Sequence, residues 1–144
     1  VRIDANGNVG IGTNDPNATL HVDGEFILGT DGAPDSVAIS SGVCTTTKAY
    51  NEIEAEGGAA DNLDQINGGV RGQIIIISPE NGSETITIRD ENTASGDTAG
   101  ANIQTGTGAP NIAMTNRGDI TVLIFGHNSE WKVIASHGTG WDGM

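Results

Sequence analysis

The sequence has few aromatic residues, few bases and a single cysteine. Five of its 144 residues are aromatic, and six Lys or Arg stand against 19 Asp or Glu, so the formal charge is −13 at pH 7. A lone Cys44 excludes an internal disulfide, and without a CxxC or haem motif we expect it to be a small buried apolar side chain. Because only 35% of the residues are apolar, small aliphatic side chains must fill a lean core.

The few basic residues are scattered singly along the chain. Binding to nucleic acid requires clustered Lys and Arg, so this distribution excludes a nucleic-acid partner and disfavours an anionic membrane surface. The longest apolar run, Ile74–Ile77, has the length of a strand and not the ~20 residues of a membrane-spanning helix. The residues after Val1 have neither the basic nor the apolar region of a secretory signal, so no signal is expected in the sequence shown.

Apolar residues alternate in twos, which predicts strands rather than helices and an all-β fold. Gly, Pro, Asp and Ser separate these short stretches, as in many all-β domains. The segment Ser78–Glu84 contains a Pro and an Asn-Gly pair. It predicts a turn that joins Gln73–Ile77 and Thr85–Arg89 into a hairpin.

A second hairpin is predicted where Ile120–Phe125 and Trp131–Ala135 flank the five residues Gly126–Glu130. The segment Asp61–Ile66 begins with a capping-type Asp and has apolar residues at a spacing of three, which predicts one helical turn. The segment from Asp90 to Asn116 is rich in Gly, Ala, Thr and Asn, and predicts weak strands and long loops.

Three acids alternate along one predicted strand, at Glu52, Glu54 and Glu56. Alternate residues of a strand share a face, so these carboxylates are expected to be solvated together. A chain with so many small residues has little cross-strand surface to bury alone, and this favours a core shared between identical chains. Trp131 is expected to pack over the core opposite Leu123 or Phe125, with an acceptor for its indole N–H.

The segment Asn6–Val22 reads NGNVGIGTNDPNATLHV and resembles the GNVGIGTxxPxxxLHV stretch of bacteriophage tail fibres and related trimeric adhesins. Later segments are similar to the C-terminal head of many phage fibre proteins, and with the first they cover most of the chain. They are Ala55–Gly69, Gly72–Ile77, Thr85–Asp90, Asp119–Phe125 and Glu130-Trp131. The sequence departs from the head pattern at Phe125–Asn128 and in the longer loop Ser78–Glu84, where receptor contacts are made in the family.

The resemblance implies a homotrimer with two parts. Residues 1–24 would form a short intertwined β segment, and residues 25–144 an antiparallel β-sandwich-like head. The trimer interface would include Val9, Ile11, Leu20 and Val22. The implied function is non-enzymatic attachment of an extracellular virion to its host, with a cell-surface glycan or protein and other tail proteins as partners, and without membrane insertion.

Ligand contacts are expected in loops, because loops on a rigid scaffold usually carry recognition. The loops are Ser78–Glu84, Asp90–Pro110 and Gly126–Glu130. Carbohydrate is the leading ligand class, bound weakly on each chain and strengthened by multivalency. The expected contact residues are Asn81, Asp97, Asn102, His127, Asn128 and Trp141.

Two other functions remain open at this point. The first alternative is a structural virion protein, such as a head fibre or capsid decoration. The second is a polysaccharide depolymerase that uses a carboxylate pair. No nucleophile elbow or phosphate-binding loop accompanies its acids. The tripeptide Arg117-Gly118-Asp119 is read as a turn before Ile120 rather than an integrin motif.

No cofactor is expected from the sequence, although oxygen-rich loops allow a Ca²⁺ site. The residues considered for it are Asp90, Asn92, Asp97 and Asn102. A transition metal on a three-fold axis, held by one His from each chain, is the other metal site considered. The spacing of His21, His127 and His137 matches no zinc pattern.

Overall fold

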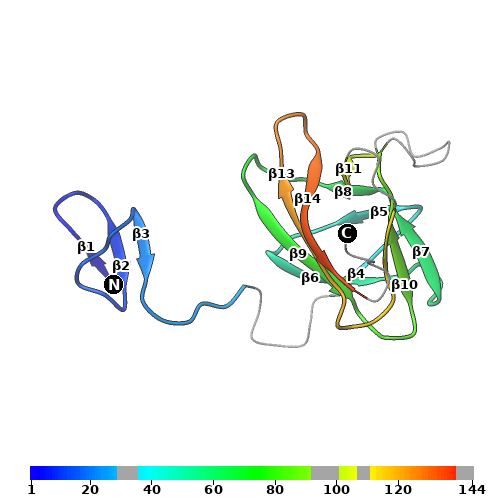
Figure 1. Cartoon of the computed structure of the whole chain (residues 1–144), viewed down its shortest axis with the longest axis horizontal. Helices are drawn as coiled ribbons and strands as arrows, with labels where there is room; N and C mark the ends of the chain where they lie inside the picture. The colour runs from blue at the N-terminus through cyan, green and yellow to red at the C-terminus, as the bar shows by residue number, and fades with distance from the viewer. Residues whose placement is uncertain (29–35, 92–100, 107–110, 139–144) are drawn as a thin grey trace.

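The computed structural model describes residues 1–28, 36–91, 101–106 and 111–138. Every regular element in these ranges is a β-strand, which confirms the predicted all-β class (Figure 1). Within these ranges no helix has the length and apolar character needed to cross a membrane.

The N-terminal sheet consists of three very short strands. Its central strand β2 pairs with β1 in the antiparallel direction and with β3 in the parallel direction. Its strands are β1 (Arg2–Ile3), β2 (Val9–Ile11) and β3 (Leu20–Val22). The Asp4 carboxylate accepts the backbone N–H groups of Asn6 (2.8 Å) and Asn8 (2.9 Å), which fixes the turn before β2. Gly12 has a φ of +80°, and a Cβ there would collide with the Asp23 carbonyl oxygen.

The head contains three further sheets. The largest has the strand order β11–β14–β13–β9–β6–β4, with bounds Ile103–Gln104, Trp131–His137, Ile120–Phe125, Ile74–Pro79, Tyr50–Glu54 and Ser36–Ala38. The three-stranded sheet has the order β12–β10–β7, with bounds Ile112–Met114, Thr85–Ile88 and Ala60–Leu63. The two-stranded sheet pairs β5 (Val43–Thr45) with β8 (Gln65–Asn67).

The expectation of an antiparallel head is wrong for most of its strand pairs. The antiparallel pairs are β9–β13, β13–β14 and β10–β12. The parallel pairs are β4–β6, β6–β9, β7–β10, β5–β8 and β11–β14. Parallel neighbours need a crossover connection. The chain supplies one by forming β7 and β8 between β6 and β9.

A single apolar core is shared by the three sheets of the head. It is built mainly from isoleucine, and it includes Ile77 and Leu123 of the largest sheet, Ile86 of the second and Ile66 of the third. Cys44 is also buried in it, as predicted. Small aliphatic side chains therefore do fill the core of this aromatic-poor chain.

The predicted hairpin of β13 and β14 is confirmed, with a register shift between Val122 and Leu123. The predicted pairing of β9 with β10 is wrong, because these strands belong to different sheets. The loop between them is held by the end of β6 instead. The Ala55 N–H donates to the buried Glu84 carboxylate at 2.9 Å, and the Glu80 N–H donates to the Ile53 carbonyl at 2.9 Å.

The predicted helical turn at Asp61–Ile66 is also wrong, because these residues belong to β7 and β8. The chain bends between the strands at Asp64, where the N–H groups of Asp64 and Gln65 both donate to the Gly42 carbonyl at 2.8 and 3.1 Å. The Asp64 carboxylate forms an ion pair with Arg89 rather than capping a helix. Hydrogen bonding to Asp64 raises the pKa of Arg89 above its usual value.

The strand prediction around Glu52 and Glu54 is confirmed by β6, but the expectation that all three acids are solvated is wrong. Glu56 is exposed and Glu54 is half-buried, whereas Glu52 is buried. The reason is position in the sheet, since Glu52 lies between Ser36 of β4 and Ser78 of β9. Arg117 lies 3.9 Å from its carboxylate and supplies the nearby positive charge.

Candidate functional site

The strand pairing in the largest sheet shows that the start of β4 and the β13–β14 turn lie at different ends of the sheet. Ser36, the first residue of the first head strand β4, pairs with Glu52, which pairs with Ser78 near the end of β9. The β13–β14 turn follows Phe125, and the residue before it, Ile124, pairs with Ile74 at the start of β9. At about 3.3 Å per residue, Ile74 and Ser78 are roughly 13 Å apart along the strand. The turn is therefore at the end of the sheet remote from the chain entry.

This remote turn presents two of the predicted contact residues, His127 and Asn128. Both side chains are exposed, and His127 Nδ1 lies 2.7 Å from Asn128 Oδ1. The turn closes through a 2.7 Å hydrogen bond from the Gly126 N–H to the Glu130 carbonyl. Ser129 has a φ of +63°, an uncommon value for a residue with a side chain. We call residues 126–130 together with Arg71 the distal tip.

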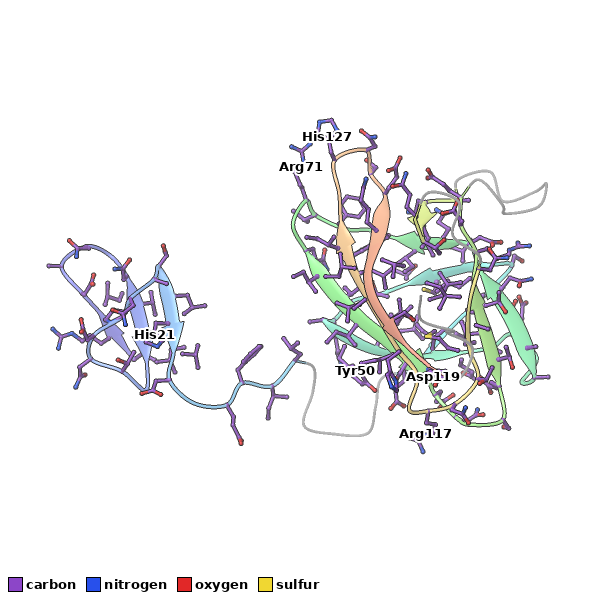
Figure 2. All side chains as sticks on the ribbon, viewed as in Figure 1. His21, Tyr50, Arg71, Arg117, Asp119 and His127 are labelled. Carbon is purple, nitrogen blue, oxygen red and sulfur yellow. The ribbon has the colours of Figure 1, made fainter. Side chains whose placement is uncertain are left out.

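Arg71 joins this tip from the turn that precedes β9. The Gly72 N–H donates to the Phe125 carbonyl at 3.0 Å, which ties the two turns together. Gly69 has a φ of +117° and lies against the Phe125 ring, where a Cβ would not fit. Figure 2 shows Arg71 and His127 projecting at the same end of the head. Sequence reasoning missed Arg71 because a single cation in a turn has no local signature.

Trp131 follows the distal tip directly and anchors its base in the core. Trp131 is fully buried, and its indole N–H donates to the Ile66 carbonyl at 3.1 Å. Its ring meets that of Phe125 edge-on, with centroids 5.0 Å apart. These contacts confirm the prediction for Trp131, and they hold both ends of the tip on the core.

The other predicted contact residues are not gathered at the tip. Asn81 lies in the loop after β9, at the opposite end of the sheet, where its Oδ1 accepts the Ser83 N–H at 2.9 Å. Asn102 uses its amide within the fold, since it accepts the Ile66 N–H at 3.0 Å and donates to the Ile66 carbonyl at 2.9 Å. Asp97 and Trp141 lie outside the described residues.

The tripeptide at 117–119 forms the predicted turn before β13. Its Asp119 is buried, and its carboxylate accepts the N–H groups of Thr115 at 2.6 Å and Asn116 at 3.1 Å. Figure 2 places Arg117 and Asp119 at the end of the head opposite His127. Because the carboxylate is enclosed by its own loop, this turn does not present an acid to a ligand.

Of the four residues considered for Ca²⁺, the structure describes Asp90 and Asn102. Asp90 is buried and accepts the Thr105 N–H at 2.9 Å and its hydroxyl at 3.2 Å. Asn92, like Asp97, lies outside the described residues. Across the described part of the chain, no group of three or more His, Cys, Asp or Glu side chains is placed to hold a metal ion.

Burial raises the pKa of the Cys44 thiol to about 12.

The N-terminal sheet presents the four residues implied for a trimer interface. Ile11 is 42% exposed and Leu20 is 61% exposed, while Val9 and Val22 are half-buried. No large apolar side chain is buried between residues 1 and 28. This sheet therefore has no core of its own.

Comparison with protein-family models, with curated proteins and with solved structures found no match for the chain.

Proposed function

We propose that this chain is a non-enzymatic attachment module of a phage tail fibre or a related trimeric virion adhesin, which binds a glycan of the host surface. The observation that carries the proposal is the separation of the chain entry from the distal tip within one sheet. A fibre that enters the head at Ser36 presents His127 and Arg71 at the far end. This is the end that first meets a cell.

The chemistry of the tip suits a polar sugar. Arg71 provides a guanidinium with several N–H donors, and His127 and Asn128 add ring and amide groups that donate or accept. All three side chains are exposed. In a chain with a formal charge of −13, a cation at the tip also reduces repulsion from acidic glycans.

The N-terminal segment supports the homotrimeric part of the proposal. Three strands without a buried apolar face are not expected to be stable alone. Intertwining of three copies would cover Ile11 and Leu20, which are exposed in a single chain. Three tips on one assembly then bind a surface with an effective concentration that a single tip does not reach.

The test is binding of the full chain to an array of bacterial surface polysaccharides and to the bacteria that carry them. Arg71→Gln is expected to weaken binding by about tenfold, which corresponds to about 1.4 kcal/mol. Arg117→Gln is the matched control, because it removes the same charge from an exposed Arg at the other end of the head.

Equal weakening by both variants would contradict the tip as the binding site. Binding to virion proteins but to no glycan or cell would overturn the attachment function and favour a structural virion component. Release of reducing ends from a bound polysaccharide would overturn the non-enzymatic part of the proposal.

A further inference from the structure

The end of the head opposite the distal tip is strongly acidic. β6 runs parallel to β9, with Glu52 beside Ser78, so both strands end far from the tip. The loop after β9 bonds to the backbone where β6 ends, through the Glu80 N–H and the Glu84 carboxylate. The carboxylates gathered at this end are those of Glu52, Glu54, Glu56, Glu80 and Glu84. Like charges repel, so an anionic polymer is kept away from this end.

Two bases lie together at the tip end, Arg71 and Lys132. The Gly72 N–H, beside Arg71, donates to the Phe125 carbonyl at 3.0 Å. Lys132 is on β14, and its Cε lies 2.9 Å from where a Cβ on Gly126 would be. Both bases are exposed, and both are held at the start of the β13–β14 turn.

The ion pairs in the described part of the chain leave these two bases without a carboxylate partner. Arg89 forms an ion pair with Asp64. Arg117 lies 3.9 Å from a carboxylate oxygen of Glu52. Within the described ranges, no ion pair joins either base of the tip end to an acid. The charge of both bases is therefore available to a ligand.

The acids near Arg71 and Lys132 do not cancel their charge. Glu130 is the acid of the distal tip itself. Glu91 lies beyond β11, where its Oε1 accepts a hydrogen bond from Gln104 Nε2 at 2.8 Å, and Gln104 pairs with Lys132. Glu91 is thus two strand spacings from Lys132, about 10 Å, and charges at that distance are largely screened at physiological salt. Counted against Glu130, the two bases leave one positive charge.

We propose that the distal tip binds the carboxylate groups of an acidic polysaccharide, with Arg71 and Lys132 as the residues that select the charge. This inference rests on the proposed function and names the class of glycan. The planar guanidinium of Arg71 can donate two parallel hydrogen bonds to a carboxylate, and Lys132 adds a point charge. One positive charge at the tip matches the single negative charge of a carboxylate. The field of the head also turns the tip toward an anionic surface, because the acidic end is repelled.

The experiment uses the full chain and an array of bacterial surface polysaccharides, each present intact and with its carboxyl groups reduced to alcohols. Reduction removes the charge and keeps the sugar backbone. We expect the bound polysaccharides to carry carboxylates, and reduction to weaken their binding about tenfold. Added salt should weaken binding of the intact form more than binding of the reduced form.

Lys132→Gln removes one charge beside the tip and is expected to weaken binding of the intact form about threefold. Binding of the reduced form should stay unchanged, whereas a merely structural role of Lys132 would weaken both. Lys132→Arg keeps the charge and should bind like the original chain. Arg117→Gln is the matched control, because it removes a charge at the acidic end. Far-ultraviolet circular dichroism checks the fold of each variant, and Lys132→Met replaces Lys132→Gln if the latter is unfolded.

Equal binding of intact and reduced polysaccharides, or a preference for neutral ones, would overturn the inference. Loss of binding in Arg71→Gln would in that case still uphold attachment through the tip. An affinity for the intact form that Lys132→Gln leaves unchanged would overturn the inference as well. So would equal weakening by Lys132→Gln and Arg117→Gln, because the net charge of the chain would then set the affinity. A chain that binds no polysaccharide would contradict the attachment function itself, and the inference would fail with it.

Discussion

The N-terminal sheet and the head are built from the same kinds of residue, but only the head has an interior. Strands of the N-terminal sheet are two or three residues long, and no large apolar side chain is buried between residues 1 and 28. The head buries a continuous cluster that reaches from Ile39 to Trp131. The same alternation of small aliphatic residues thus yields a folded domain in one region and an incomplete layer in the other.

The difference indicates where stability comes from. Burial of apolar area contributes about 25 cal/mol per Å². The head gains this contribution within one chain, whereas Ile11 and Leu20 gain it only when another surface covers them. Local turns such as the one at Asp4 order the N-terminal backbone without supplying a core. We infer that copies of the chain supply the missing layer.

The largest effect is expected from a core substitution in the head. Ile77→Ala removes a fully buried side chain from the central strand β9 and should lower the free energy of unfolding by about 2–5 kcal/mol. Ile11→Ala truncates an exposed side chain of the N-terminal sheet and should leave the thermal midpoint of the head unchanged while weakening assembly. Thermal unfolding and sedimentation of both variants check this contrast. If Ile77→Ala and Ile11→Ala lowered the stability of the head equally, the proposed difference between the two regions would be contradicted.

A smaller effect is expected from the backbone of the N-terminal sheet. Gly12→Ala puts a Cβ against the Asp23 carbonyl at a φ of +80° and should destabilise this sheet by about 1–2 kcal/mol. Assembly should weaken while the thermal midpoint of the head stays constant. Gly7→Ala serves as the control, because Gly7 also has a positive φ but no atom within 4 Å of an added Cβ. Assembly unaffected by Gly12→Ala would show that the N-terminal sheet is not part of the contact.

The smallest effect is a difference in the reactivity of Cys44. Burial raises the pKa of this thiol from 9.0 to about 12, so the folded state disfavours the reactive thiolate. The preference of the folded state for the protonated thiol contributes to stability. This contribution is complete below pH 9 and is lost as the pH rises toward 12. At pH 8 iodoacetamide should label Cys44 only when the head opens. The labelling rate should therefore be higher in Ile77→Ala than in the original chain, and unchanged in Ile11→Ala. Fast labelling of the original chain would mean that the head core is open.

The sequence predicted features that depend on neighbours along the chain. The β13–β14 hairpin follows from two apolar strands with a five-residue connection, and the burial of Trp131 and Cys44 follows from their apolar character. The separate placement of β9 and β10 was missed, because it depends on the contact of Glu84 with Ala55, a residue 29 positions away. A turn rich in Pro and Gly does not specify which strand its ends will pair with.

The bend at Asp64 and the cation at the tip were missed for similar reasons. Leu63 and Ile66 have helical spacing, but the Gly42 carbonyl and the Arg89 side chain hold this segment as two strands. Arg71 lies at the tip, where the turn that contains it is bonded to β13 through Gly72 and Phe125. His127 and Asn128 were found because they occupy the turn of a hairpin that local pattern predicts.

The central claim is that the N-terminal sheet becomes stable only when copies of the chain supply its missing layer. Light scattering of the full chain, from micromolar concentrations upward, tests it most directly. The account predicts a mass three times the 14.7 kDa of one chain, with residues 1–28 resistant to protease. A particle of one chain mass whose N-terminal residues resist protease equally well would contradict it.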